Sequence, residues 1–271
     1  MNKESLHTFV ILAYKESSYI QECISALKKQ SVASRIVVAT STPSEFLKEL
    51  SNKEKLELVV NPASGNIASD WSFGYALAKT KYVTLAHQDD IYNEDYTKEC
   101  VSKMDRFKNS LIGFSNYSEL ICSKVVNNNL NLVVKKILLN VFYVFGYINS
   151  NVFKKKSLVF GSPICCPSVV FNKNNIGDFE FDKNIGCALD WDAWLRLAQR
   201  KGDFVYIRKT LMQHRIHPIA QSALYIQNGK RAAEELEIFR KIWPKPLAVL
   251  VSKLYSLSHK LYRIGGMCGK Q

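Results

Sequence analysis

Four polar residues follow the apolar run at residues 82–86: His87, Gln88, Asp89 and Asp90. Adjacent carboxylates repel each other, so a neighbouring cation is the simplest reason to hold two of them together. Paired carboxylates suit Mg²⁺ or Mn²⁺, which usually bridges one or two of them to substrate phosphates. The alternative is structural, because aspartate also favours turns and helix starts. The residues alone leave both interpretations open.

Two histidines, His214 and His217, invite a second metal interpretation. They lie three residues apart in a strand-like segment, and on a strand such side chains point to opposite faces. A two-histidine site for a transition metal is therefore not expected.

The acidic pair must be positioned by alternating strands and helices. Apolar and β-branched runs predict strands at 7–14, 35–41, 56–61 and 81–87. Helical spacing predicts helices between them, at 17–30, 43–53 and 67–80. This alternation is typical of βαβ units and a mainly parallel sheet. Ligands bind at the carboxyl ends of such strands, where the acidic pair, residues 14–16 and residues 40–42 all lie.

The second half of the chain is less regular. A helix is predicted at 96–107 and a strand, or a strand pair, at 111–121. An apolar insertion with lysines at both ends occupies 133–156. The spacing of Trp191, Leu195 and Ala198 predicts a helix at 188–202, and residues 203–217 return to strand-like alternation.

The composition of the chain limits the kinds of binding partner that we expect. The chain has 37 Lys and Arg against 24 Asp and Glu, a net charge of +13, which favours nucleotides, phosphorylated lipids or membranes. No nucleic-acid-binding motif is visible, so nucleic acid is not an expected partner. The N-terminus is too polar for a signal peptide, and no run of about 18 apolar residues is present to span a bilayer. The seven cysteines contain no CxxC pair, and a reducing, cytoplasmic location is expected.

The order of several motifs resembles the family 2 glycosyltransferases, in particular those of bacterial surface and capsular polysaccharide synthesis. The motifs are FVILAYKES, RIVVATSTPSE, VNPASGNIASDWSFGYALAKTKYVTLAHQDD, ALDWDAWLRL and HRIHPIAQS, and they cover about residues 7–222. The resemblance implies an α/β GT-A (Rossmann-like) fold, with a mainly parallel central sheet flanked by helices. It divides the chain into a GT-A domain at 1–222, with a nucleotide-sugar half at about 1–100 and an acceptor half at about 101–222. Residues 223–271 then form a C-terminal helical extension.

The resemblance also implies a site for a nucleotide-sugar donor, UDP- or dTDP-linked. In the family the end of the first strand contacts base and ribose, a group after the second strand contacts the base, and the third helix lies beside the nucleotide. The metal motif follows the fourth strand, with Asp90 as direct ligand and Asp89 orienting ribose or a metal-bound water. A loop histidine, with Arg215 as a second candidate here, reaches the diphosphate or the metal. The matching residues are Ala13, Tyr14, Glu16, Thr40, Ser41, Asp70, Trp71, Gln88, Asp89, Asp90 and His217.

The implied reaction is metal-dependent transfer with inversion, using Mn²⁺ or Mg²⁺, to a glycan or lipid-linked glycan acceptor. A carboxylate at the start of a helix removes the proton of the acceptor hydroxyl. Asp190 matches the family's position for this base, with Leu189 replacing the usual glutamate, and Asp192 is the alternative. Either aspartate could instead serve as a helix cap.

The C-terminal segment is basic and amphipathic. From Ile238 onward there are seven Lys or Arg and no Asp or Glu. Leucines and an isoleucine recur at spacings of three and four: Leu247, Leu250, Leu254, Leu257, Leu261 and Ile264. Such a helix either lies in the headgroup region of an anionic membrane or packs against its own domain or a second copy of the chain. A peripheral location at the inner face of the plasma membrane fits the first interpretation.

The residues alone leave two rival functions open. A nucleotidyltransferase would need a glycine-rich phosphate loop near the N-terminus, and ILAYKESSYI contains no glycine. A non-catalytic membrane- or partner-binding module on a degenerate GT-A fold is the other rival, since Leu12, Ser69, His87 and Leu189 depart from the family pattern.

Overall fold

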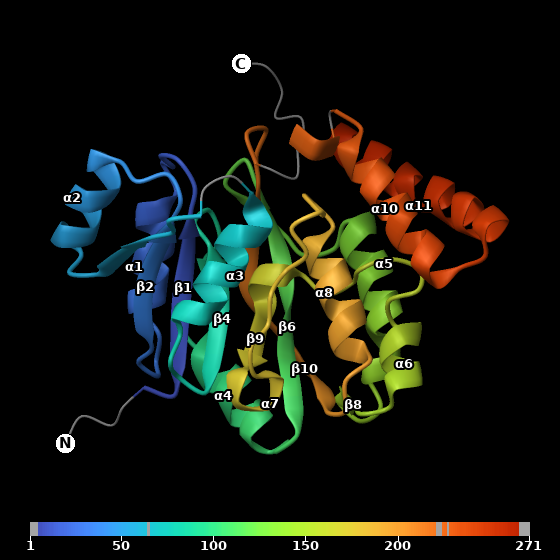
Figure 1. The fold of residues 1–271 in the computed structure, drawn as a ribbon, viewed down its shortest axis with the longest axis horizontal. Helices are drawn as coiled ribbons and strands as arrows, with labels where there is room; N and C mark the ends of the chain where they lie inside the picture. Colours follow the sequence, from blue (N-terminus) through green and yellow to red (C-terminus); the bar gives the residue numbers. More distant parts are fainter. Residues whose placement is uncertain (1–4, 64–65, 221–223, 227, 266–271) are drawn as a thin grey trace.

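The computed structural model describes residues 5–63, 66–220, 224–226 and 228–265, with side chains described as far as residue 256. A ten-stranded sheet forms its centre, in the order β3-β2-β1-β4-β9-β6-β10-β5, with β7 beside β6 and β8 beside β10 (Figure 1). The strands are β1 His7–Ala13, β2 Arg35–Thr40, β3 Glu57–Val60, β4 Tyr82–His87, β5 Ile91–Tyr92, β6 Ser110–Ile121, β7 Lys124–Val126, β8 Tyr147–Ile148, β9 Val169–Asn172 and β10 Asp203–Ile216.

Helices connect and cover these strands. They are α1 Ile20–Lys28, α2 Glu45–Lys53, α3 Ile67–Leu77, α4 Tyr96–Asp105, α5 Leu130–Leu138, α6 Asn151–Lys156, α7 Lys173–Ile176, α8 Leu189–Ala198, α10 Lys230–Ile242 and α11 Lys245–Gly265. The described residues also contain two short 3₁₀ turns, η1 Leu139–Phe142 and η2 Cys166–Ser168. The α/β fold class is confirmed, and α3 begins after an Asn66 cap whose side chain accepts from Ser69 N.

The first four main strands pair in parallel, as predicted. β1 pairs with β2 and with β4, and β2 pairs with β3. β6 and β10 form a second parallel pair. The two parallel groups are joined by β9, which runs antiparallel to both β4 and β6 and was not predicted. The carboxyl ends of β1, β4, β6 and β10 therefore lie at the same edge of the sheet.

Each face of the sheet carries its own apolar cluster. Along β1, Val10 packs into one cluster, whereas Phe9 and Ile11 pack into the other, as strand alternation requires. The Val10 cluster includes side chains of α3 and α8, among them Trp71 and Trp194. The second cluster collects side chains of α1, α2 and α4. The starts of α3 and α8 are thus fixed over one face by large buried aromatic rings.

The C-terminal helices pack on α8. Trp191 meets Phe239 of α10 edge to face at 4.8 Å between ring centroids, and Tyr255 of α11 at 5.8 Å. Part of the predicted leucine stripe is exposed: Leu247, Leu250 and Leu254 face outward, whereas Ala248 is buried. The side chains of Leu257, Leu261 and Ile264 lie outside the described residues. Within the described residues, no helix combines the length and apolar character needed to cross a membrane.

Candidate active site

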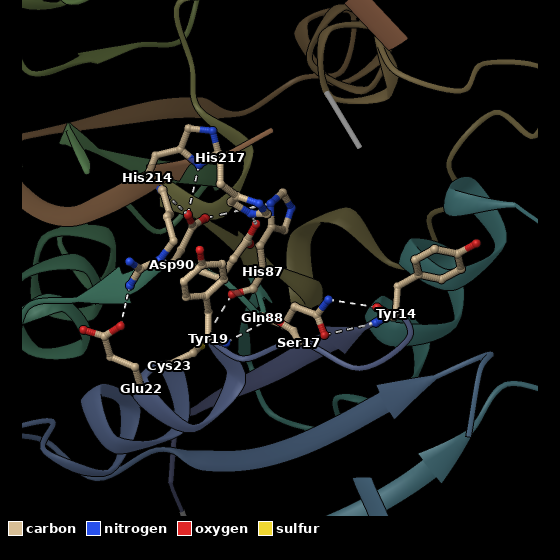
Figure 2. A network of polar contacts seen from close by, with 12 residues as sticks. Tyr14, Ser17, Tyr19, Glu22, Cys23, His87, Gln88, Asp90, His214 and His217 are labelled. Atoms are coloured by element: carbon tan, nitrogen blue, oxygen red, sulfur yellow. Dashed lines mark hydrogen bonds and ion pairs between the residues drawn. The ribbon is translucent and has the colours of Figure 1, made fainter. Parts of the chain in front are cut away.

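The ends of β1 and β4 are joined by the side chain of Gln88. Leu12 of β1 is in register with His87 of β4. One residue further on, Tyr14 N donates to Gln88 Oε1 at 3.2 Å, and Gln88 Nε2 donates to Tyr14 O at 2.9 Å (Figure 2). Gln88 is expected to contact the donor, but its side-chain amide forms both of these hydrogen bonds with the backbone of Tyr14. This leaves the Tyr14 ring, 41% exposed, projecting from the strand end.

The acidic pair is bound by the end of β10. His214 Nδ1 donates to Asp90 Oδ1 at 3.0 Å, and His217 Nε2 donates to Asp89 Oδ2 at 2.8 Å. The expectation that the two histidines face apart is wrong, because β10 ends at Ile216 and His217 lies beyond the strand. Each ring therefore contacts one carboxylate of the acidic pair, and Figure 2 shows the contact of His214 with Asp90.

Several polar atoms at this point lack a hydrogen-bond partner within the described residues, although His87 Nδ1 lies 3.9 Å from Asp90 Oδ2. Asp90 is fully buried, yet its Oδ2 has no hydrogen bond, and neither do His87 Nε2 and His217 Nδ1. His87, Asp89 and Asp90 each offer a ligand atom, and these atoms lie within 4.8 Å of one another. Buried polar atoms are normally paired, so these unpaired atoms are available to a ligand. Two carboxylates and one imidazole can hold a divalent cation such as Mn²⁺.

Opposite charges shift the pKa values of this cluster. Burial lowers the pKa of His214, but the Asp90 and Asp89 carboxylates outweigh it and hold the pKa above its usual value. Burial raises the pKa of Asp89, but the hydrogen bond from His217 and the charges of the surrounding histidines hold it below the usual value. The lowered pKa favours the ionised form of the Asp89 carboxyl group.

Arg215 forms hydrogen bonds with both residues of the acidic pair. Its backbone N donates to Asp90 Oδ1 at 2.9 Å and its Nε donates to Asp89 O at 2.8 Å. Its guanidinium pairs with Glu22 of α1 and lies 4.3 Å from the centre of the Tyr19 ring. The sequence analysis missed Glu22 and Tyr19, since no local motif marks a contact made across 193 residues.

Asp70 and Trp71 of α3 lie beneath the strand ends. Asp70 Oδ2 accepts from Ser41 Oγ and Asp70 Oδ1 accepts from Asn61 Nδ2, each at 2.8 Å. Asp70 thus ties α3 to the ends of β2 and β3. Trp71 is 7% exposed and packs 5.3 Å from the His87 ring, so it supports that ring from the core side.

The remaining predicted donor residues differ in exposure. Ala13 and Thr40 are buried at their strand ends, and Glu16 is exposed. Thr42 Oγ1 accepts from Lys15 N at 2.6 Å, which joins the loops after β1 and β2. These loops border the site, and Tyr14, Glu16 and Ser41 offer the reachable side chains.

Asp190 and Asp192 have different surroundings in α8. Asp190 Oδ1 accepts from Trp191 N at 2.8 Å, and its Oδ2 has no hydrogen bond within the described residues. Asp192 is 5% exposed, and both its oxygens bind cations: Arg196 Nε at 2.7 Å and Lys241 Nζ at 3.1 Å. Neither residue is the N-cap of α8, which is Ala188. Burial raises the pKa of Asp190, although Arg231, the Trp191 N–H, Lys135 and His87 each lower it.

The start of α8 is held by Glu234 of α10. Its carboxylate accepts the backbone N–H groups of Gly186 at 2.9 Å, Cys187 at 2.7 Å and Ala188 at 3.2 Å. These hydrogen bonds lower the pKa of Glu234 against the opposing effect of burial. Helix N-termini leave such donors unpaired, and an anion there is favourable. Sequence analysis missed this contact because Glu234 lies outside every motif.

A cavity of about 580 Å³ lies between α1, β5 and β10, and none of the predicted site residues lines it. The acidic pair lies instead at the carboxyl end of β4.

Sequence comparison identifies the family. The profile described as Glycosyl transferase family 2 matches residues 8–168, more than half of the chain. The chain belongs to glycosyl transferase family 2. It is therefore a glycosyltransferase, as the order of motifs predicted. No curated protein matches the chain in sequence.

Solved structures share the GT-A fold of this family 2 member. S. aureus TarS 1–349 superposes with a TM-score of 0.62 at 12% identity, covering 93% of this chain and 70% of that one. The mannosyltransferase PcManGT from Pyrobaculum calidifontis, in complex with GDP-Man and Mn²⁺, gives 0.63 at 14% identity, covering 94% and 70%. TarS 1–349 in complex with UDP-GlcNAc gives 0.58 at 13% identity, covering 92% and 71%. The chain spans 39% of the longer TarS structure.

Proposed function

We propose that the protein transfers a sugar, with inversion, from a UDP- or dTDP-linked donor to a glycan or lipid-linked glycan in cell-surface polysaccharide synthesis. The observation that carries the proposal is the set of ligand atoms offered by His87, Asp89 and Asp90, which lie within 4.8 Å of one another. Asp190 lies at the start of α8, and the charge of His87 acts on the pKa of its carboxyl group. A cation site and a carboxylate base are the two parts that glycosyl transfer needs.

Asp190 is the base in this proposal. Its free carboxylate oxygen takes the proton of the acceptor hydroxyl as the hydroxyl oxygen attacks the anomeric carbon and the bond to the diphosphate breaks. Asp192 is disfavoured because Arg196 and Lys241 occupy both of its oxygens. A pKa raised by burial makes the Asp190 carboxylate the stronger base.

His87, Asp89 and Asp90 would hold Mn²⁺ or Mg²⁺, which when bound stabilises the charge on the departing nucleoside diphosphate. His217 keeps one ring nitrogen on Asp89 and leaves the other for the ligand. In the same proposal Tyr14, Glu16 and Ser41 border the nucleoside. The expected location is the inner face of the plasma membrane, where a lipid-linked acceptor would be met.

The test is calorimetric titration of UDP, dTDP, GDP and CDP with and without Mn²⁺. Wild type is compared with Asp90→Asn, which keeps the side-chain shape, and with the exposed control Asp178→Asn. We expect one nucleotide to bind in a metal-dependent way, and only Asp90→Asn to abolish it. Slow donor hydrolysis, followed as diphosphate release, should be lost in Asp190→Asn with donor affinity kept. A folded wild type that binds none of the four would refute the donor site and favour the non-catalytic module.

A further inference from the structure

Exposed apolar side chains are concentrated in one segment. Of the 21 exposed large apolar residues in the described chain, ten lie between residues 130 and 160. They belong to α5, η1, α6 and the turns that join them, which lie on the side of the sheet away from α2 (Figure 1). They are Leu130, Val133, Val134, Ile137, Val141, Val144, Phe145, Val152, Phe153 and Phe160. Apolar exposure on this scale marks an interaction surface.

The charge of the same segment has one sign. Residues 120–177 contain seven lysines and neither aspartate nor glutamate. A docking partner for this surface must therefore offer negative charge beside an apolar phase.

The two most exposed of these residues are neighbours. Val144 is 75% exposed and Phe145 is 73% exposed. The turn that carries them is fixed: Gly146 N donates to Phe142 O and Tyr206 N donates to Gly146 O, each at 2.8 Å. Gly146 has φ +72°, a conformation that glycine adopts without strain. A rigid turn presents its apolar tip without an ordering cost on binding.

A basic cavity adjoins this tip. It has a volume of about 400 Å³, and Val144 and Phe145 form part of its wall. Its cations come from α4, from the C-cap of α4 and from β10: Lys103, Arg106, Arg208 and Lys209. The lining includes one carboxylate, Glu99, which pairs with Lys209 at 2.9 Å. The cavity therefore keeps a net positive charge beside the apolar tip.

We propose that this surface docks the protein on a bilayer containing anionic phospholipids. Val144 and Phe145 enter the headgroup region, and the cations of the cavity bind lipid phosphates. Apolar side chains beside lysine and arginine are the combination that interfacial binding uses. An apolar protein partner would not account for four cations lining one cavity. The proposal does not depend on the transfer chemistry.

One element of this surface, α5, also reaches the surroundings of the acidic pair. Lys135 of α5 donates to the hydroxyl of Tyr117 at 2.8 Å. The Tyr117 ring lies 6.3 Å from the ring of His214, which binds Asp90. The helix that contributes exposed Val133, Val134 and Ile137 thus also contacts the surroundings of the acidic pair.

The test is co-sedimentation of the full chain with vesicles of phosphatidylcholine alone or mixed with phosphatidylglycerol. Three variants are compared with wild type: Val144→Ser with Phe145→Ser, Arg106→Glu with Arg208→Glu, and the control Phe46→Ser with Val60→Ser on α2 and β3. We expect binding only to the anionic vesicles, weakening as salt rises. Each of the first two variants should weaken it about tenfold or more, and the control should not.

Three results would overturn the proposal. The first is equal binding of the tip variant and wild type, which would leave α11 or another element as the anchor. The second is full suppression of binding by free inorganic phosphate with no effect of the tip variant, which would make the cavity a phosphate site. The third is a dimer, seen by light scattering, that the tip variant dissociates. Donor titration of each variant stays a separate measurement, so failure here leaves the proposed function untouched.

Discussion

The carboxylate of Glu234 on α10 accepts the backbone N–H of Cys187 at 2.7 Å, three residues before Asp190. The C-terminal segment therefore positions the helix that carries the proposed base. A boundary near residue 222 remains a prediction, and the side-chain contacts of α10 with α8 cross it.

Replacing Glu234 with glutamine should lower both stability and turnover. Loss of the charged acceptor is expected to cost about 1–3 kcal/mol of the free energy of unfolding, measured by urea denaturation. Turnover should fall while donor affinity stays, because the change moves Asp190 and not the strand ends. Glu237→Gln, on the same helix and in an ion pair with Arg240 at the surface, is the control. Equal losses in both variants would contradict a positioning role.

The effect of Glu234 should depend on pH with a defined sign. Its pKa is lower in the folded chain than in the unfolded one, so its stabilisation is present above the usual glutamate pKa and disappears as pH falls through the folded value. The difference in unfolding free energy between wild type and Glu234→Gln should shrink accordingly on acidification. A difference that grows at low pH would refute this assignment.

Asp190→Asn and Asp192→Asn should separate chemistry from structure. The first variant should lose about 100- to 10,000-fold in turnover with little change in melting temperature. The second breaks the ion pairs to Arg196 and Lys241 and should melt at a lower temperature while retaining measurable turnover. Turnover and thermal unfolding of the two purified variants decide the matter, and the reverse pattern would make Asp192 the base.

The pH profile should report the raised pKa of Asp190. A base works only when deprotonated, so kcat/KM at saturating metal should rise with pH through this pKa. We expect the acid limb above the usual aspartate range, because burial raises the pKa of Asp190. Asp89 should not be confused with it, since its pKa is lowered. An acid limb at or below the usual aspartate value would argue against Asp190.

The metal preference should depend on His87. An imidazole beside two carboxylates favours Mn²⁺ over Mg²⁺, because imidazole nitrogen is a poor ligand for Mg²⁺. His87→Asp should therefore strengthen nucleotide binding in Mg²⁺ relative to Mn²⁺, measured by calorimetry with both ions. An unchanged ratio in a folded variant would remove His87 from the ligand set.

Periodicity predicted the elements that carry the acidic pair. The four strands, the helices between them and the helix that begins near Asp190 follow from spacing within short windows. The position of Asp89 and Asp90 at the end of β4 was predictable for the same reason. Their roles as ligands and the role of Asp190 remain predictions.

Contacts between distant residues could not be predicted in this way. The Arg215–Glu22 ion pair and the hydrogen bonds of Glu234 to the start of α8 depend on how elements pack, which no local pattern encodes. The antiparallel strand β9 contains only four residues, too few for alternation to show its direction. Strand alternation also misplaced His217, because the exact end of a strand is set by its surroundings.

The histidines that bind the acidic pair lie 124 and 128 residues further along the chain. During synthesis, Asp89 and Asp90 leave the ribosome long before these two histidines do. Until β10 is made, the two neighbouring carboxylates lack both hydrogen-bond partners. If the acidic pair holds the donor as proposed, sugar transfer is withheld from unfinished chains.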